Sequence, residues 1–289
     1  MKKITKAVIP SAGFGTRFLP FTKAVPKEML PIVDTPAIEY TVREAINSGV
    51  TDIVVVISPD KECIRTHFNH NEQFEKFLIN KGKKEELDII TEMPRIANVN
   101  FVYQYEQLGL GHAVLCAKDY IGNDDFALLL ADDIYVGEDG PVLKDLISAY
   151  NEKGSSILGT LEVQTNDISR YGICDVDGEE VNGIAKLKSV IEKPEPKDAP
   201  SNLAIGGRYI LTNKIFDFLE NQTRGAGGEI QLTDSILRLM KEEDVYSYRI
   251  KGKRYDIGSK IGFLKATIEF SLNRDDLKED IKCIINNVK

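Results

Sequence analysis

Short apolar segments alternate with amphipathic ones along the first half of the chain. Four of them are apolar at most positions and contain many β-branched residues, which is typical of strands covered on both faces of a sheet. They lie at residues 6–10, 52–57, 99–104 and 126–130. Between and after these strands, apolar residues at helical spacing predict helices over residues 35–46, 111–120 and 142–152. The alternation predicts a mainly parallel sheet between two layers of helices.

The other segments fit around this framework. Thr35-Pro36 is expected to begin the first helix, with the hydroxyl as its cap and the proline at the first helical position. The polar, charged stretch 67–98 contains helical turns and is predicted to be an excursion at the sheet edge. The second half is completed by predicted strands over 156–163, 172–176 and 206–211, a helix over 213–220 and a helical tail over 261–289. Since no linker or repeat interrupts the chain, we predict a single domain.

Composition and charge exclude several classes of function. Hydrophobic residues make up 42% and charged residues 28% of the 289 residues, as in a globular protein with a substantial core. The formal net charge of −8 repels nucleic-acid backbones, so no nucleic-acid partner is expected. Nowhere do 18 apolar residues follow one another, and the apolar run near the start ends at Pro10, so neither a membrane span nor a signal peptide is predicted. Four scattered cysteines and three histidines lack the spacing of a zinc site and fit the cytoplasm.

A glycine-rich turn, Ser11-Ala12-Gly13-Phe14-Gly15-Thr16-Arg17, follows the first predicted strand directly. In a parallel sheet this is the carboxyl edge, where ligands bind, and glycines let backbone N–H groups approach phosphate oxygens. Arg17, Lys23 and Lys27 add cations in a loop that prolines stiffen. The P-loop motif is missing, and Phe18 replaces the last glycine of the dinucleotide fingerprint. The turn therefore predicts a site for several phosphates in an otherwise acidic protein.

The turn and the loop after it resemble a family signature. Gly13-Phe14-Gly15-Thr16-Arg17, followed by Pro26-Lys27-Glu28, is similar to the signature of sugar-1-phosphate nucleotidylyltransferases. The longer string FTKAVPKEMLPI resembles their bacterial UTP:glucose-1-phosphate uridylyltransferase branch. Further matching strings occur in the family's order: GLGHA at 109–113, VIEKP at 190–194, APSNLAI at 199–205, GAGGEIQLTD at 225–234 and GKRYDIG at 252–258. The resemblance covers nearly the whole chain, from Lys6 to about Phe270.

The resemblance implies a Rossmann-like, three-layer α/β/α fold with a mixed central sheet. It implies one catalytic domain in which residues 1–135, with the helical insertion 67–98, form the nucleotide-binding half and residues 136–259 the sugar-phosphate-binding half. Residues 260–289 are expected to be helices that contribute to an oligomer. The implied reaction is attack by the phosphate of glucose 1-phosphate on the α-phosphorus of UTP, which yields UDP-glucose and releases pyrophosphate.

By the same resemblance, the nucleotide is expected at the glycine turn. Arg17 and Lys27 would hold the triphosphate and stabilise charge on the leaving pyrophosphate, whereas Lys23 is expected to be solvated. Gln104, at a strand end, would read the uracil edge with its amide. His112 is interpreted as structural, because the attacking phosphate is already ionised and needs no base. The remaining nucleotide-binding residues that the resemblance implies are Ala12, Gly13, Gly15, Thr16, Glu28 and Gly109.

The sugar phosphate and the metal are assigned to other strings. Lys193 is similar to the catalytic lysine that grips the sugar phosphate, and Glu192 would accept hydrogen bonds from sugar hydroxyls. Backbone contacts with the hexose are implied at Gly172, Asn202 and Ala204. Mg²⁺ is expected on Asp132, which follows an apolar strand, since this ion takes one or two carboxylates together with phosphates and water. Asp256 matches a second metal-binding carboxylate of related thymidylyltransferases, and direct and indirect binding to the metal both stay open.

Three alternatives remain. A thymidylyltransferase of the same superfamily is the nearest, although the insertion 67–98 and the PKEMLPI loop favour the uridylyl branch. A non-catalytic sugar-nucleotide-binding regulatory subunit would lack catalytic groups, yet all four implied catalytic residues are present. A dinucleotide oxidoreductase would need the missing fingerprint glycine. One departure from the uridylyltransferases is Leu108, where a lysine often precedes the GLGHA string.

The predicted helical tail carries more apolar residues than one helix face can hide, among them Ile261, Phe263, Leu264, Ile268 and Ile285. A helix that is apolar on much of its circumference is usually buried on more than one side. Together with the resemblance, the tail predicts a homodimer or homotetramer built on a two-fold symmetric contact.

Overall fold

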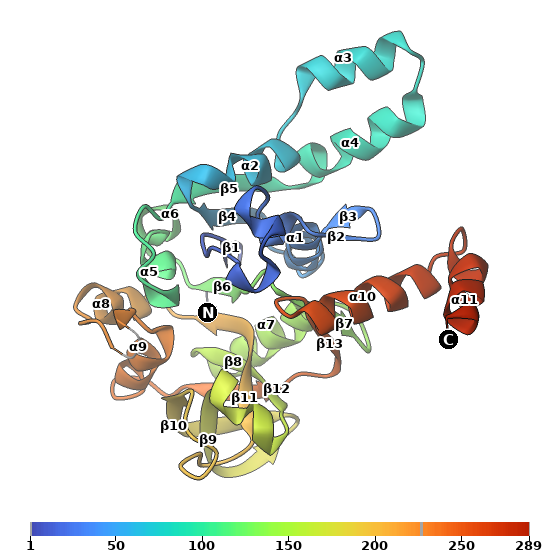
Figure 1. The fold of residues 1–289 in the computed structure, drawn as a ribbon. Coiled ribbons are helices and arrows are strands. Elements are labelled where there is room, and N and C mark those ends of the chain that lie inside the picture. The colour runs from blue at the N-terminus through green and yellow to red at the C-terminus, as the bar shows by residue number, and fades with distance from the viewer. Residues whose placement is uncertain (1, 226–227, 289) are drawn as a thin grey trace.

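A nine-stranded mixed sheet forms the centre of the computed structural model, which describes residues 2–225 and 228–288 (Figure 1). The strand order is β5-β4-β1-β6-β11-β8-β12-β10-β9. Strands β5, β4, β1 and β6 run parallel, whereas β11 runs antiparallel to both β6 and β8. The strands are β1 (Lys6–Pro10), β4 (Asp52–Ile57), β5 (Asn98–Tyr103), β6 (Phe126–Leu129), β8 (Ile157–Glu162), β9 (Gly172–Val181), β10 (Ile184–Glu192), β11 (Leu203–Leu211) and β12 (Tyr246–Arg249).

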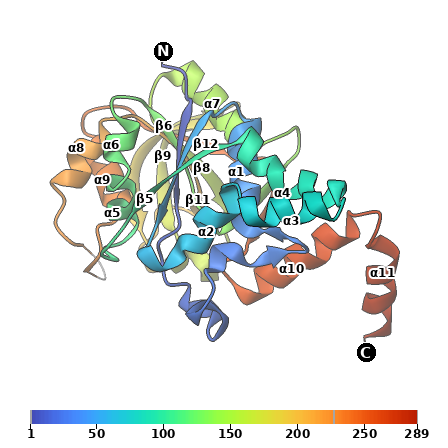
Figure 2. The ribbon, with the colours of Figure 1, turned by 90° about the horizontal axis from the view of Figure 1, so that it is seen from above.

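Helices cover both faces of this sheet because successive side chains of a strand point to opposite faces. In β1, Ile9 packs with α1 (Ala37–Asn47) and α7 (Val142–Lys153) on one face, and Val8 packs with the helices of the other face. The helices of that second face are α5 (Leu110–Leu115), α6 (Lys118–Ile121), α8 (Ile215–Glu220) and α9 (Leu232–Leu239). Figure 2 shows the two helix layers on either side of the strands. The predicted three-layer α/β/α fold with a mixed central sheet is confirmed.

The start of the first helix differs from the prediction. Thr35 and Pro36 form the short strand β3, which pairs with β2 (Pro31–Ile32), and α1 begins at Ala37. The hydroxyl of Thr35 donates to Asp34 and does not cap the helix. The predicted helix over 111–120 is likewise two helices, α5 and α6. The cap and proline signals at Thr35-Pro36 do not register the pairing of β3 with β2, and helical spacing over 111–120 does not show where a helix is interrupted.

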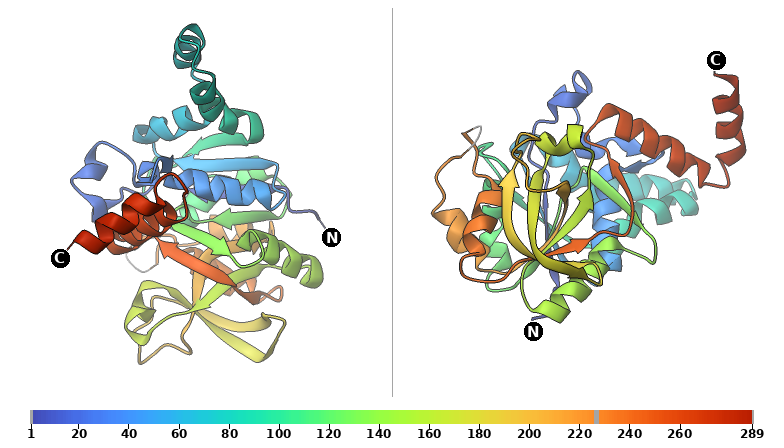
Figure 3. Two further views of the ribbon diagram at one scale, coloured as in Figure 1. Left: turned by 90° about the vertical axis from the view of Figure 1, so that its right-hand side faces the viewer. Right: turned by 90° about the horizontal axis from the view of Figure 1, so that it is seen from below.

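Two helix pairs stand away from the sheet. Outside the edge strand β5, the polar stretch forms α3 (Glu72–Asn80) and α4 (Lys84–Ile96), after α2 (Glu62–Phe68). The tail forms α10 (Lys260–Leu272) and α11 (Lys278–Asn287), which project from the body in Figure 1 and in the right panel of Figure 3. Both segments are helical as predicted. In the described part of the chain, every helix is too short or too polar to cross a membrane.

A second, two-stranded sheet brings a distant segment to the carboxyl edge of the main sheet. Strand β7 (Asp133–Gly137) continues the chain directly beyond β6, and β13 (Gly252–Asp256) pairs with it in antiparallel register. This register sets Asp256 opposite Asp133. The pairing therefore carries the C-terminal GKRYDIG string to the residues that follow the apolar strand β6.

Candidate active site

The glycine turn after β1 is packed against the loop that carries Lys27. Gly15 has φ 65°, and a Cβ atom on it would lie 3.1 Å from the Cβ of Lys27. Any larger residue would therefore be strained and would push Lys27 away. Thr22 reinforces the contact, because its hydroxyl donates to the carbonyl of Gly15 at 2.8 Å. The turn and the cationic loop form one rigid unit.

A buried lysine that the sequence analysis missed holds this turn from below. The side chain of Lys61 is 4% exposed, and its Nζ donates to the carbonyls of Ser11 at 2.7 Å and Gly13 at 2.6 Å. It also donates to Oε2 of Glu28 at 2.9 Å, and Glu28 is itself 2% exposed. A buried ammonium needs such partners, and here all three are acceptors. Nothing in the neighbouring sequence distinguishes Lys61 from a surface lysine.

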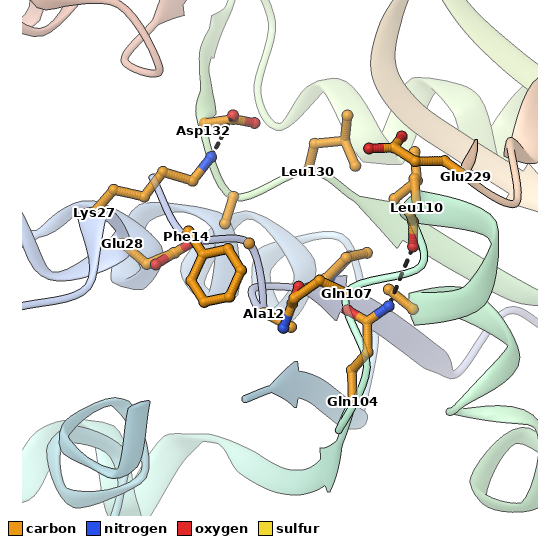
Figure 4. Close-up of a pocket in the computed structure, with 15 residues that line it drawn as sticks. Ala12, Phe14, Lys27, Glu28, Gln104, Gln107, Leu110, Leu130, Asp132 and Glu229 are labelled. Carbon is orange, nitrogen blue, oxygen red and sulfur yellow. Dashed lines mark hydrogen bonds and ion pairs between the residues drawn. The ribbon is translucent and has the colours of Figure 1, made fainter. Parts of the chain in front are cut away.

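The residues predicted to bind the nucleotide line a pocket of about 370 Å³ (Figure 4). Its walls include most of that set together with two predicted catalytic residues: Ala12, Gly13, Glu28, Gln104, Gly109, Lys27 and Asp132. Gly15 and Thr16 line a smaller adjoining pocket with Arg17 and Lys27. Lys23 is exposed and lines neither pocket, as expected of a solvated side chain.

Gln104 is held with its amide at this pocket. Its Nε2 donates to the carbonyl of Gly109 at 3.2 Å, as drawn in Figure 4, and lies 2.9 Å from Nδ1 of His112. His112 therefore orients Gln104, which agrees with a structural role. Gly109 has φ 95°, and a Cβ atom there would lie 2.7 Å from the Cβ of Glu229, so glycine is required. The backbone N–H of Ile230 donates to the carbonyl of Leu108 at 2.7 Å.

The approach of Gly109 to Glu229 and the hydrogen bond between Ile230 and Leu108 bring together two strings that lie far apart in the sequence. GLGHA forms one wall of the pocket, and Glu229 of the GAGGEIQLTD string lies against it. Ala226 and Gly227 of that string lie outside the described residues. Both strings were identified from the sequence by resemblance, but only the tertiary structure shows that they are in contact.

Lys27 and Asp132 meet between the two halves of the site. Lys27 Nζ lies 2.7 Å from Oδ2 of Asp132, and both side chains are partly exposed. Burial alone would lower the pKa of Lys27, but the carboxylates of Asp132 and Glu28 outweigh it and raise the pKa above its ordinary value. Burial would likewise raise the pKa of Asp132, yet Lys27, with Arg17, holds it below its ordinary value. Both groups are therefore charged near neutral pH.

Asp132 and Asp256 face the same small space beside Gly258. A Cβ atom on Gly258 would lie 3.0 Å from Oδ2 of Asp132 and 3.2 Å from Oδ1 of Asp256. The other oxygen of Asp256 pairs with Arg170 at 2.8 Å. Two carboxylates around a space that a methyl group would fill fit a magnesium ion. Within residues 2–225 and 228–288, no group of three or more His, Cys, Asp or Glu could hold a metal, so phosphates or water would supply the other ligands.

A second pocket of about 310 Å³ opens on the other side of Asp132. Its cations are Arg17, Arg170, Lys193 and Arg254, and its carboxylates are Asp132, Asp133 and Asp256. Such a mixture suits a phosphate held next to a metal. Of these cations, Arg170 and Arg254 were not predicted. Arg170 stands in no distinctive local pattern, and Arg254 lies within the GKRYDIG string but was given no role there.

Asp133 and Arg254 form the buried base of this second pocket. Arg254 donates to Asp133 through Nε at 2.7 Å and to the hydroxyl of Tyr171 through Nη1 at 3.1 Å. Burial raises the pKa of Asp133 to about 6. The negative charge of Asp132 also raises this pKa, whereas the positive charge of Arg254 lowers it. Asp133 therefore serves to anchor Arg254, while Asp132 is the carboxylate that faces the ligand space.

The residues predicted to bind the sugar phosphate differ in their position relative to the second pocket. Lys193 lines it, pairs with Glu192 at 3.1 Å and remains half exposed. Glu192 accepts from Thr233 at 2.6 Å, and a Cβ atom on Gly172 would lie 3.3 Å from Glu192 Oε2. Lys193 is the one member of this set that lines either pocket, since Gly172, Glu192, Asn202 and Ala204 are absent from both linings. Asn202 is exposed and Ala204 is buried in β11.

Known proteins that resemble this chain show the family to which it belongs. The sequence pattern described as nucleotidyl transferase matches residues 6–271. A UTP–glucose-1-phosphate uridylyltransferase of Staphylococcus epidermidis is 49% identical over 288 residues, which cover 100% of this chain and 99% of that protein. A UTP-bound UGPase from Acinetobacter baumannii matches with a TM-score of 0.91 and 42% identity, over 99% of this chain and 100% of that chain.

A UDP-glucose pyrophosphorylase complexed with UDP-glucose matches with a TM-score of 0.86 and 39% identity, over 94% of this chain and 100% of that chain. The match to the nucleotidyl transferase pattern and the match to the Staphylococcus protein both extend over the two pockets and over every string that carried the resemblance. The chain therefore belongs to the nucleotidyl transferase family, in its UTP–glucose-1-phosphate uridylyltransferase branch.

Proposed function

We propose that this protein forms UDP-glucose and pyrophosphate from UTP and glucose 1-phosphate. The observation that carries the proposal is the position of the Lys27–Asp132 pair, whose members line the nucleotide pocket while Asp132 also lines the second, cation-rich pocket. A reaction between two polyanions needs them brought together at a site that neutralises their charge. The relatives that bind UTP and UDP-glucose support this choice of substrates.

In this mechanism the first pocket positions UTP. Gln104 offers its amide to the uracil edge, and Ala12 and Gly13 lie along the nucleoside. Lys27 and Arg17 bind the triphosphate, and Lys27 stabilises the charge that develops on the departing pyrophosphate. Because Lys27 already carries a full positive charge, it needs no proton transfer to do so.

The second pocket positions glucose 1-phosphate for in-line attack. Lys193 binds the phosphate, and its half-exposed ammonium is free to turn from Glu192 towards the substrate. Glu192 then accepts from hexose hydroxyls beside Gly172. The attacking phosphate oxygen is already ionised, so no residue is required as a base.

Asp132 would hold Mg²⁺, and Asp256, whose Oδ1 lies near the same point beside Gly258, would add a second carboxylate oxygen. When bound, the ion would neutralise charge on the phosphates of both substrates. To admit it, Lys27 must release Oδ2 of Asp132 and move to the phosphates.

Pyrophosphate release tests the proposal directly. Purified protein with Mg²⁺ would be tried with each common nucleoside triphosphate against several sugar 1-phosphates. We expect the highest rate with UTP and glucose 1-phosphate. A preference for dTTP would establish the thymidylyltransferase alternative, and sugar-nucleotide binding without any release would establish the regulatory one.

We further propose that the protein is at least a dimer and works in the cytoplasm. Apolar side chains on α10 and α11 remain exposed, among them Ile261 at 77%, Leu264 at 53% and Ile284 at 57%. Exposed apolar surface of this kind favours association. All four cysteines are free, which suits a reducing compartment. We expect more than the monomer mass in light scattering at micromolar concentration, and a monomer would refute the association.

A further inference from the structure

A fully buried arginine lies beneath the turn that carries Asp132. Arg208 belongs to β11 and is 0% exposed. The register of β11 against β8 shifts between Ile205 and Tyr209, so Arg208 stands in a bulge. The bulge includes Gly207, whose φ of 74° favours glycine and whose carbonyl accepts from the backbone N–H of Leu130 at 2.9 Å.

The guanidinium of Arg208 bonds both ends of this turn. Nη1 donates to the carbonyl of Leu130 at 2.9 Å, and Nη2 donates to the carbonyl of Asp133 at 2.6 Å. Asp132 lies between these two residues. The planar guanidinium therefore fixes the backbone on either side of the carboxylate that faces the metal space.

The remaining donors of Arg208 bind Glu44 on α1. Nε and Nη2 lie 3.1 and 2.8 Å from Oε2 of Glu44, and Oε1 of Glu44 also accepts from the backbone N–H of Leu143 at 3.1 Å. The pair thus links the turn to the first residues of α7. Buried ion pairs add little net stability compared with apolar residues, so this one calls for another explanation.

Tyr135 strengthens the same arrangement. Its hydroxyl donates to the carbonyl of Gly206 at 2.6 Å, and the guanidinium carbon of Arg208 lies 5.0 Å from its ring centroid. The bulge, the arginine and the turn are therefore locked to one another. A shift of about 1 Å in a reacting group can cost roughly a hundredfold in rate.

We infer that the Arg208–Glu44 pair is a positioning device that aims the Asp132 carboxylate at the metal space beside Gly258. It acts on the backbone of the turn and touches neither substrate. The inference rests on the proposed function in that Asp132 holds the metal. Arg208 and Glu44, which lie outside every motif string, thereby gain a role in metal affinity.

The test is the ratio between the affinity for Mn²⁺–UTP and the affinity for UTP with a chelator, measured by calorimetry. Mn²⁺ takes the same oxygen ligands as Mg²⁺. Arg208→Lys keeps the charge, but one ammonium cannot span both carbonyls and the carboxylate. We expect the ratio to fall about tenfold, with the affinity for metal-free UTP unchanged and the rate reduced by roughly 10- to 100-fold.

Tyr150→Phe is the matched control. Its hydroxyl donates to Asp125 at 2.6 Å, just before β6 begins, so the variant disturbs the opposite end of the same strand. It should alter thermal stability and leave the ratio as in wild type. Tyr135→Phe removes one bond to the bulge and should lower the ratio less than Arg208→Lys, so the inference stays testable if the latter does not fold.

Several outcomes would overturn the inference. The first is an affinity ratio that stays at the wild-type value in both Arg208→Lys and Tyr135→Phe. The second is an equal fall of this ratio in the control Tyr150→Phe. The third is a ratio of one in the wild-type protein, which would mean that the metal does not strengthen UTP binding. If wild-type protein binds Mn²⁺–UTP but forms no UDP-glucose, the proposed function fails, and the ratio in the variants still decides the role of the pair.

Discussion

Gly258→Ala tests whether the space between the two carboxylates is a metal site. The new methyl group would lie 3.0 Å from Oδ2 of Asp132 and 3.2 Å from both Oδ1 of Asp256 and Nη1 of Arg17. Ordinary contacts of a Cβ atom exceed about 3.4 Å, so each neighbour must retreat by a few tenths of an ångström. Magnesium binds oxygen at about 2.0–2.1 Å and demands near-octahedral geometry, which such shifts disturb.

The expected result is a rise of about tenfold in the Mg²⁺ concentration for half-maximal rate, equivalent to about 1.4 kcal/mol. The backbone of Gly258 is not in the left-handed region, so the free energy of unfolding should change by less than about 1 kcal/mol. The assay is pyrophosphate release over a Mg²⁺ titration at saturating substrates, with chemical denaturation as the stability measurement.

Ser259→Ala is the control for this segment. Ser259 caps α10 by accepting from the backbone N–H of Gly262 at 3.2 Å, and its removal should cost about 1 kcal/mol of stability without raising the Mg²⁺ requirement. If Gly258→Ala had the Mg²⁺ requirement of wild type, the space beside Gly258 would not hold the metal.

The remaining predictions concern the charged groups of the site. Asp132→Asn should nearly abolish turnover and Asp256→Asn should cost less, as measured by kcat; equal losses would make Asp256 a direct and equivalent ligand. Lys27→Ala should impair the UTP step, whereas Lys193→Ala should chiefly raise the KM for glucose 1-phosphate; kinetics with each substrate varied separately would expose a reversed assignment. The pKa of Asp133 is raised to about 6 in the folded state, so its ionisation opposes folding as the pH rises from about 4 to 6. Denaturation of Asp133→Asn across that window should lack this contribution, and an unchanged pH dependence would contradict the assignment.

The carboxyl-edge positions of the site followed from the sequence because they depend on local patterns. Continuous apolar runs identified β1, β4, β5 and β6 to within one residue at each end. Parallel strands end at one edge, so residues directly after them converge. The glycine turn and Asp132 were placed at this edge on that basis, whereas Gln104, at another strand end, was assigned by resemblance. Residues of the turn, Gln104 and Asp132 all line the first pocket.

Strands with a polar or mixed face were harder to predict from the sequence. Strand β10 was not predicted, because exposed Lys186 and Lys188 interrupt its apolar positions. The turn signal before it, Asn182-Gly183 with positive φ at both residues, was overlooked, although it joins β10 to β9 as a hairpin. The short strands β12 and β13 were missed for a similar reason, since each is defined by its partner and not by its own composition. Asp256 was thus assigned by resemblance, and its place opposite Asp133 came from the pairing of β13 with β7.

What the sequence determined by itself was the layered α/β architecture and the residues that stand at strand ends, because burial and periodicity act over a few residues. The tertiary structure alone decided which charged groups are paired. Lys61 beneath the glycine turn, Arg254 on Asp133 and Arg208 on Glu44 each meet partners 33 to 164 positions away in the chain. A charged side chain carries no local sign of such a partner, since its burial is settled only when distant strands and helices pack together.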